Sequence, residues 1–337
     1  MTAAQRRPYL PFLLVLLSKS RLLLAAVPLL VAQIAWGAIE VTQDAEKVTI
    51  NLDGQLFTEY HYTGAPHVYF YPVIGPGGAK MTRNYPMQDL PEEEHDHFHH
   101  RSLWFAHGLV NGVDFWSELK SKYPIGKIEH EKFLELKGSE KEGVVSSSNR
   151  WVAPDGSVPL TSIQTFRVYE RPSSERLFDF EVTLKAADKD VVMGDTKDGG
   201  MAIRLAETMR LMKPKKQPGD GHLVNSEGVR DGEVWSKRAK WVDYSGPVDG
   251  KILGVAIFEN PRNATAPTRW HAREYGLFAA NPFCNHDMDK TAPEDSGTYT
   301  IPAGQSITLR YRFLIHEGDA DQAKIADRYR EYLLDVK

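Results

Sequence analysis

Alternation of apolar and polar residues constrains this chain more than any other feature of its sequence. From about residue 38 onward the pattern has a period of two, as in Val48-Thr49-Ile50-Asn51-Leu52. That period is typical of strands with one buried face. Asp53-Gly54 marks a tight turn before the next alternating run, Gln55–Tyr62, so the sequence predicts a β-hairpin. Further strands are expected at Ile39–Thr42, His67–Val73, Ile128–Lys137, Gly143–Val152, Leu160–Tyr169, Leu177–Ala186, Gly199–Glu207, Trp235–Tyr244, Lys251–Glu259 and Ser306–His316.

Many short strands separated by turns favour an all-β sandwich or barrel over an alternating βαβ fold. Only Asp319–Val336 has a helical period, with Ala323, Ala326, Tyr329 and Leu333 on one stripe. Gly318 and Asp319 can start this helix. We therefore expect residues 38–337 to form a single domain, a large antiparallel β-sandwich with a C-terminal helix.

The N-terminal residues 1–37 have the pattern of an export signal. Arg6 and Arg7 precede two apolar runs, Leu10–Leu17 and Leu22–Ala35. The second run is shorter than the roughly 20 residues of a typical membrane-spanning helix. Small residues at Ala35 and Gly37 suit cleavage before Ala38. We expect a periplasmic or secreted protein, with an uncleaved membrane anchor as the alternative.

Two features of the composition limit the partners and the source of stability. The net charge of -4 gives no reason to expect nucleic acid, or a membrane beyond the N-terminal segment, as a partner. The single cysteine, Cys284, excludes an intramolecular disulfide. Core packing must therefore stabilise the fold.

The chemistry is concentrated in a histidine-rich segment. Five of the twelve histidines lie within thirteen residues: His95, His97, His99, His100 and His107. If the segment is extended, His95, His97, His99 and Arg101 share one face and His100 points the other way. Histidine titrates near neutrality, so His99, His100 or His107 is a candidate acid or base.

A metal site is the alternative interpretation of the same histidines. Neutral imidazoles on one face bind zinc, copper or nickel. His97 and His99 would supply two ligands, with His271 or His286 completing the coordination sphere. We expect no cofactor for the acid–base interpretation, whereas the metal-site interpretation requires a divalent metal.

Aromatic and polar residues next to the histidines suggest a sugar as ligand. Trp104 and Trp116 flank a polar set that includes Asn111 and Asp114. Sugar rings stack on tryptophan through their C–H faces, while their hydroxyl groups need amides and carboxylates. Tryptophans in a strand are also common in ordinary cores.

Two later stretches could complete the site. Arg204 and Glu207 lie in an otherwise apolar run, where a charge needs a partner or a ligand. If the stretch after Trp270 is extended, His271, Arg273 and Tyr275 lie on one face. These groups suggest an anionic or polyhydroxylated ligand, and a buried hydrogen-bond network is the alternative.

The segment Asp96–Trp116 resembles the signature of a bacterial family labelled PmoA, also described as a domain of unknown function. The family pattern runs approximately Asp-His-Pro-His-His-Arg-Gly/Ser-Leu-Trp-Phe-Ala-His-Gly-Asp-Val-Asn-Gly-Val-Asp-Phe-Trp. This chain departs from it with Phe98 in place of proline and Leu109 in place of aspartate. The label echoes a methane monooxygenase subunit, but no apolar span follows residue 37, so methane oxidation is discarded.

The resemblance implies a fold similar to the galactose-mutarotase-like β-supersandwiches. That fold occurs in sugar epimerases, polysaccharide lyases and glycoside hydrolases. Fold analogy alone does not establish an activity.

The leading hypothesis is a carbohydrate-active enzyme that uses histidine and carboxylate acid–base chemistry. The reaction, whether hydrolysis, elimination or epimerisation, is left open, and so is whether the chain is an enzyme at all. The candidate catalytic residues are His99, His100, His107, Glu207 and His271, with Asp114 as the alternative carboxylate. The candidate substrate-binding residues are Arg101, Trp104, Asn111, Asp114, Trp116, Arg204 and Arg273. The rival hypotheses are a metal-dependent enzyme using His95–His107 and a non-catalytic glycan-binding module.

Overall fold

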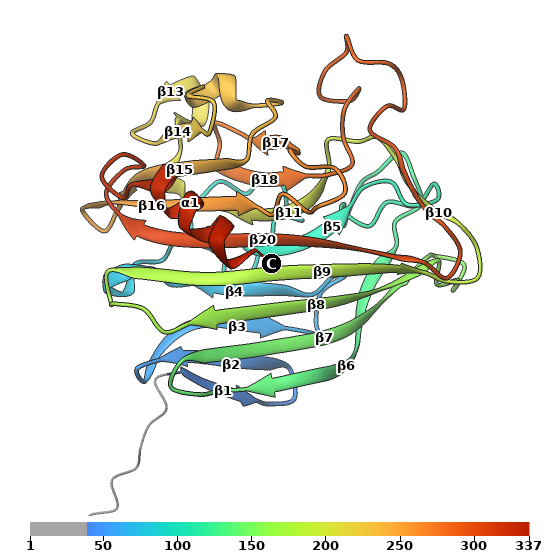
Figure 1. Ribbon diagram of the computed structural model, residues 1–337, viewed down its shortest axis with the longest axis horizontal. Coiled ribbons are helices and arrows are strands. Elements are labelled where there is room, and N and C mark those ends of the chain that lie inside the picture. The colour runs from blue at the N-terminus through green and yellow to red at the C-terminus, as the bar shows by residue number, and fades with distance from the viewer. Residues whose placement is uncertain (1–38, 337) are drawn as a thin grey trace, which may run out of the picture. The chain divides into compact units, whose positions relative to one another are not determined.

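Two eight-stranded antiparallel sheets lie face to face in the computed structural model, which describes residues 39–336 (Figure 1). The first sheet contains, in spatial order, β1 (Ile39–Gln43), β2 (Lys47–Leu52), β3 (Gln55–His61), β4 (Tyr69–Val73), β5 (Leu103–His107), β11 (Gly199–Arg204), β18 (Leu277–Asn281) and β17 (Arg269–Ala272). The second contains β14 (His222–Asn225), β15 (Trp241–Val248), β16 (Lys251–Glu259), β20 (Ser306–Glu317), β9 (Glu175–Ala186), β8 (Leu160–Tyr169), β7 (Glu142–Val152) and β6 (Lys127–Lys137). The all-β sandwich expected from the sequence is confirmed.

Smaller elements connect the two sheets. Two short strand pairs are β10 (Val191–Met193) with β19 (Tyr299–Ile301) and β12 (Met212–Lys213) with β13 (Gln217–Pro218). Four 3-10 turns are η1 (Pro76–Gly78), η2 (Glu207–Met209), η3 (Pro214–Lys216) and η4 (Asp231–Val234). The one α-helix of the described residues is α1 (Ile325–Asp335). None of the helices found between residues 39 and 336 is long and apolar enough to span a membrane.

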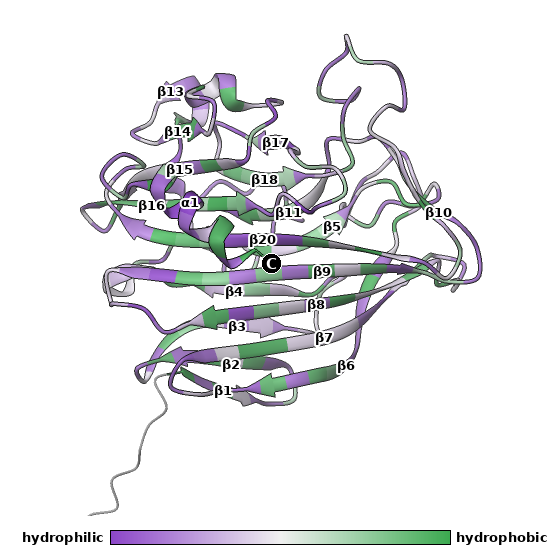
Figure 2. Ribbon diagram, viewed as in Figure 1, coloured by the Kyte–Doolittle hydropathy of each residue, from purple (hydrophilic) through white to green (hydrophobic). Residues whose placement is uncertain are grey.

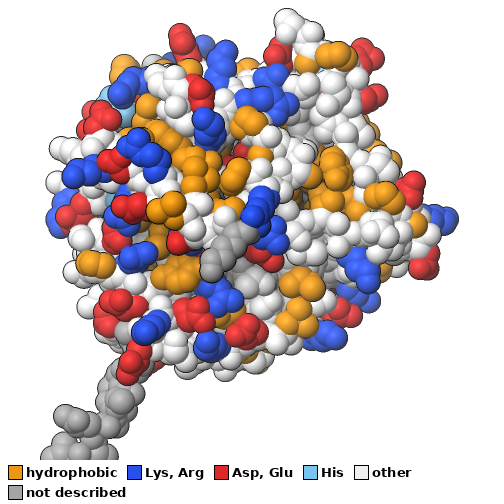
Figure 3. Space-filling model, viewed as in Figure 1, with side chains coloured by type: hydrophobic (Ala, Val, Ile, Leu, Met, Phe, Trp, Pro, Cys, Tyr) orange, Lys and Arg blue, Asp and Glu red, His pale blue; other side chains and the backbone are white. Residues whose placement is uncertain are grey.

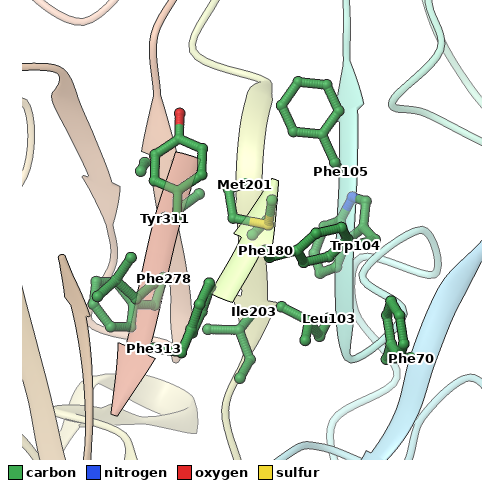
Figure 4. Packing of buried hydrophobic residues seen from close by; sticks show 14 of the residues in the cluster. Phe70, Leu103, Trp104, Phe105, Phe180, Met201, Ile203, Phe278, Tyr311 and Phe313 are labelled. Atoms are coloured by element: carbon green, nitrogen blue, oxygen red, sulfur yellow. The ribbon is translucent and has the colours of Figure 1, made fainter. Parts of the chain in front are cut away.

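The core lies between the two sheets because each sheet turns one apolar face toward the other. Hydrophobic and hydrophilic residues alternate along the front strands in Figure 2. Leu103, Phe105 and Ile203 of the first sheet are fully buried with Phe180 and Phe313 of the second (Figure 4). Burying such side chains contributes about 1.5–3 kcal/mol each relative to exposure, so this interface stabilises the sandwich without a disulfide.

The outer face of the second sheet carries a smaller apolar cluster under α1. Tyr329 and Tyr332 of the helix pack there with Phe258 and Leu314 of the sheet. Figure 3 shows this side of the molecule, where basic and acidic side chains are interspersed with apolar ones. The mixed charges agree with the near-neutral composition.

Several expected boundaries are wrong. The helix begins at Ile325 rather than at Asp319, because the Asp319 carboxylate accepts backbone N–H groups of the turn that follows and Lys324 adopts a left-handed conformation with φ 54°. Its buried stripe is Ile325, Tyr329 and Tyr332, while Leu333 is exposed.

Other segments are shorter than predicted. The strand expected at Trp235–Tyr244 is β15, which begins only at Trp241 after the η4 turn, and the strand expected at His67–Val73 begins at Tyr69. Glu207 lies in η2 rather than in a strand. The expected signal peptide, residues 1–37, lies outside the described residues, so the boundary at residue 38 stays a prediction.

Candidate functional site

The candidate site lies on the face of the first sheet that is turned away from the core, where four residues of neighbouring strands form a row. Trp104 of β5 lies opposite Ala202 of β11, and Ala279 of β18 lies opposite both Ala202 and His271 of β17. Opposed residues share a face of the sheet, while Leu103 and Phe105 point to the core side. Two alanines therefore separate the larger side chains of Trp104 and His271 on this outer face.

The histidine-rich loop that precedes β5 is a turn rather than the expected strand. His97 has φ 43°, and its carbonyl accepts the backbone N–H of His100 at 2.9 Å. The fully buried Arg83 fixes this turn, because its guanidinium donates to the carbonyls of Glu94, Asp96 and His97. The prediction that His95, His97, His99 and Arg101 share one extended face is therefore wrong.

The turn brings Asp96 and His97 into an acid–base pair. The Nδ1–H of His97 donates to Oδ2 of Asp96 at 2.7 Å. Partial burial alone would raise the pKa of Asp96, but the hydrogen bond from His97 and the charges of Arg204 and Arg83 hold it well below its usual range. An ionised Asp96 fixes the tautomer of His97, which leaves Nε2 as the free nitrogen of the ring.

His97 lies in a stack of flat rings. Its ring is 4.9 Å from Tyr275 and 4.7 Å from His100, with interplanar angles of 10° and 12°. His100 in turn lies 5.4 Å from Trp104 on the sheet below. Among His97, His99 and His100, His97 is exposed, His99 is partly buried and His100 is only 2% exposed.

His99 and His100 of the same loop are neutral at pH 7. Burial, and after it the charge of the neighbouring His97, lowers the pKa of His99 to about 4. Burial also lowers the pKa of His100 well below its ordinary value. Arg204 donates from Nη1 to Nδ1 of His100 at 3.3 Å, so Nε2 of His100 carries the proton.

Buried arginines and carboxylates surround this stack in a connected network. Arg204 contacts Oδ1 of Asp96 at 3.0 Å and lies 4.0 Å from Glu207, while Arg210 contacts both Glu207 at 2.5 Å and Glu94 at 2.7 Å. Burial raises the pKa of Glu207, with Arg210 and Arg204 opposing the shift. Glu207 is thus more easily protonated than Asp96, whose pKa is lowered.

His271 and Arg273 border the same group from β17 and the turn after it. His271 donates from Nδ1 to the carbonyl of Lys197 at 2.8 Å, and burial and then Arg273 lower its pKa to about 3. Arg273 lies over the rings of Trp235 and Tyr275, with its Cζ atom at 5.2 Å and 5.5 Å from their centroids. β17 ends at Ala272, so the expected single extended face through Tyr275 is wrong.

A second buried arginine pair supports the loop from the other side. Arg101 forms a two-bond pair with Glu118, at 2.7 Å and 2.8 Å. Burial alone would raise the pKa of Glu118, but hydrogen bonds with Arg101 and His67 lower it to about 2. Trp104 and Trp116 are buried to within 1% of complete, so both pack beneath the loop rather than forming walls open to a ligand.

Three predicted site residues lie elsewhere. Alternation along β5 turns His107 to the opposite face from Trp104, where it contacts the Gly194 carbonyl at 2.8 Å. Asp114 accepts the backbone N–H groups of Trp116 and Ser117, which is a turn-forming role. Asn111 is a turn residue with φ 49° that lines a separate surface cavity of about 600 Å³.

The expected metal ligands do not meet. Among residues 39–336, no group of three or more His, Cys, Asp and Glu side chains is placed to hold a metal ion. The metal-dependent alternative therefore gains no support from the geometry.

Sequence reasoning missed two residues of the network, Arg83 and Arg210, and treated Glu94 and Asp96 only as charges that could tune a nearby histidine. Asp96 was visible only as a charge near the histidines. Neighbouring side chains of an extended segment point apart, so the contact with His97 requires the left-handed turn. Two arginines in otherwise unremarkable positions, Arg83 and Arg210, gave no signal of burial.

The sequence profile of a family of unknown function (DUF6807) matches residues 47–330, which include every residue of the network. The chain belongs to this family. The label PmoA, which the signature segment suggested, is not part of that match. A search of curated proteins finds no match.

Two solved structures are similar to this family member at low identity. A galactose mutarotase-related enzyme from Lactobacillus acidophilus shares 8% identity and a TM-score of 0.36, covering 82% of this chain and 97% of that one. An α-galactosidase from Lactobacillus brevis shares 9% identity and a TM-score of 0.40, covering 85% of this chain. This chain spans about two fifths of the α-galactosidase, 40% of its length.

Proposed function

We propose that this protein is a carbohydrate-active enzyme that transfers a proton to or from a saccharide bound at the histidine loop. The observation that carries the proposal is the Asp96–His97 pair, in which a buried-arginine network fixes an ionised carboxylate against one nitrogen of an exposed imidazole. Such an arrangement sets the tautomer and leaves the second nitrogen for proton transfer. The role that the sequence suggested for His99 or His100 therefore passes to His97.

The surroundings of His97 suit a polyhydroxylated ligand. Tyr275 stacks against the imidazole, and Arg273 lies over the rings of both Tyr275 and Trp235. Flat rings accept the C–H faces of sugars, while charged and polar groups beside them bond hydroxyls. The buried Trp104 has a supporting role in the proposal, because its ring packs against His100.

A second proton-transfer group is needed for most reactions on a sugar. Glu207 is the proposed partner, because burial raises its pKa and its side chain keeps 18% exposure. His99 is the alternative base, since it is neutral at pH 7. Hydrolysis, elimination and epimerisation all use such a pair, and the geometry favours none of them.

The test is turnover by variants of the Asp96–His97 pair, after a saccharide panel has identified a substrate. Asp96→Asn and His97→Gln should each lower kcat by about 10²- to 10⁴-fold, because the tautomer or the proton carrier is lost. His222→Gln is the matched control, since the His222 side chain is exposed on β14 and pairs with Asp231, which is outside the network.

Full turnover by a folded His97→Gln variant would contradict the proposal. Saccharide binding without turnover by the unaltered protein would instead assign the site to a non-catalytic glycan-binding module. Circular dichroism and thermal melting of each variant separate lost chemistry from lost folding.

Export is part of the same proposal and rests on the N-terminal sequence alone. A basic start, an apolar run and small residues before Ala38 support delivery to the periplasm or the medium, where polysaccharides are met. The alternative is that residues 1–37 remain uncleaved and anchor the exported protein to the membrane.

A further inference from the structure

The charges of the network are matched in number. Arg83, Arg204 and Arg210 face Asp96, Glu94 and Glu207, and each arginine touches at least one of these carboxylates. Arg101 is likewise occupied by both oxygens of Glu118. These arginines are committed to holding the loop, so a ligand would have to displace an internal partner to use them.

Arg273 differs from all of them. Within residues 39–336 its guanidinium has no carboxylate within 4.0 Å and makes no side-chain hydrogen bond, although the residue is partly buried. Its contacts are aromatic, because its Cζ atom lies over the rings of both Trp235 and Tyr275. A guanidinium stacked on rings keeps its N–H edges free in a fixed plane, which suits a carboxylate or a sulfate.

The position of Arg273 connects it to the proposed chemistry. Tyr275 contacts both groups, since its ring also stacks on His97 at 4.9 Å. Lys197, which neighbours His271, is already paired with Asp198 at 3.3 Å. In the part of the chain that the structure describes, Arg273 is therefore the uncompensated positive charge beside the Asp96–His97 pair.

We infer that the saccharide is acidic and that Arg273 binds its anionic group. This inference rests on the proposed function, because it takes the site at His97 as the sugar site. The anionic group could be the carboxylate of a hexuronate or a sulfate ester, since both present negatively charged oxygens to a guanidinium.

The experiment compares acidic sugars with neutral forms of the same sugars. Oligosaccharides of glucuronate, galacturonate and mannuronate are titrated by calorimetry beside their methyl esters, together with a sulfated oligosaccharide that lacks uronate. The unaltered protein should bind at least one acidic probe about tenfold or more tightly than its uncharged counterpart, with the preference weakening as salt is added.

Three variants assign the preference to Arg273. Arg273→Gln should remove the preference for the acid, a loss of about tenfold or more, and leave binding of the methyl ester unchanged. Arg273→Lys should keep part of it, since the charge remains without the planar fork. Arg262→Gln is the matched control, because Arg262 is an exposed arginine that lines a different cavity near α1, and it should bind as the unaltered protein does.

Equal binding of acid and ester by the unaltered protein, or an intact preference in Arg273→Gln, would overturn the inference. Dependence on Arg273 with the sulfated probe alone would support it and name sulfate as the anion. Failure of the proposed function gives a different result: the acidic probe binds through Arg273 while Asp96→Asn leaves turnover unchanged. Turnover of acid and ester at equal rates, abolished in Asp96→Asn, would instead leave the function standing and reject the acidic substrate.

Discussion

Glu259 is a buried carboxyl outside the candidate site whose environment bears on stability. One carboxylate oxygen accepts the backbone N–H of Thr268 at 2.7 Å, while Oε1 is buried without a partner among the described residues. The hydroxyl of Tyr311, its neighbour on β20, is also buried without a partner. Burial raises the pKa of Glu259 to about 7.

The raised pKa predicts a pH-dependent stability. The folded chain keeps the Glu259 proton to higher pH than the unfolded chain, so its contribution is complete below pH 4.5 and is lost as pH rises toward 7. Glu259→Gln imitates the protonated form. It should stabilise the protein at pH 8 by on the order of 2–3 kcal/mol relative to its effect at pH 4.5.

Urea unfolding of the variant and the unaltered protein at both pH values measures this difference. Glu294→Gln is the control, because Glu294 is exposed and should show no such change. A Glu259→Gln effect that is the same at pH 4.5 and pH 8 would show that folding does not raise the pKa of Glu259.

At the scale of elements, β11 connects the candidate site to the rest of the first sheet. It lies between β5 and β18 and ends at Arg204. Gly200 lies in it with φ 97°, and a Cβ atom there would come within 2.0 Å of the Ala280 carbonyl oxygen. Both the conformation and the contact with the next strand therefore require glycine.

Gly200→Ala should destabilise the fold by about 2–4 kcal/mol, since a strained conformation and a backbone clash act together. Gly54→Ala separates the two effects, because Gly54 has φ 73° but nothing within 4 Å of an added Cβ. Gly54→Ala should lower the free energy of unfolding by about 1 kcal/mol. Chemical denaturation of both variants gives the comparison, and equal losses would rule out the clash as the dominant effect.

Sequence periodicity predicted individual strands well where a strand has one face in the core. The ranges expected at Leu160–Tyr169 and Lys251–Glu259 are those of β8 and β16. The histidine loop has no such period, and its conformation depends on Arg83 from a distant part of the chain. An extended strand was therefore the wrong expectation for that segment.

At the scale of the whole molecule, the exported form should begin at Ala38. Cleavage after the small residues at 35 and 37 follows from the pattern of residues 1–37. Mass spectrometry of the protein recovered from the periplasm or medium measures its N-terminus. An intact N-terminus recovered with the membrane fraction would support the anchor instead.

The sequence by itself determined the fold class, and it pointed to the segment and most of the residue types of the proposed site. These follow from local patterns, because alternating burial and clustered histidines are visible over a few neighbouring residues. Tertiary structure decided which of these residues are in contact. Asp96 meets His97 only because Arg83 and Arg204 hold the turn, and Tyr275 reaches His97 only because β5, β11, β18 and β17 pair in one sheet. Contacts between residues more than a hundred positions apart depend on strand order, which a local pattern does not encode.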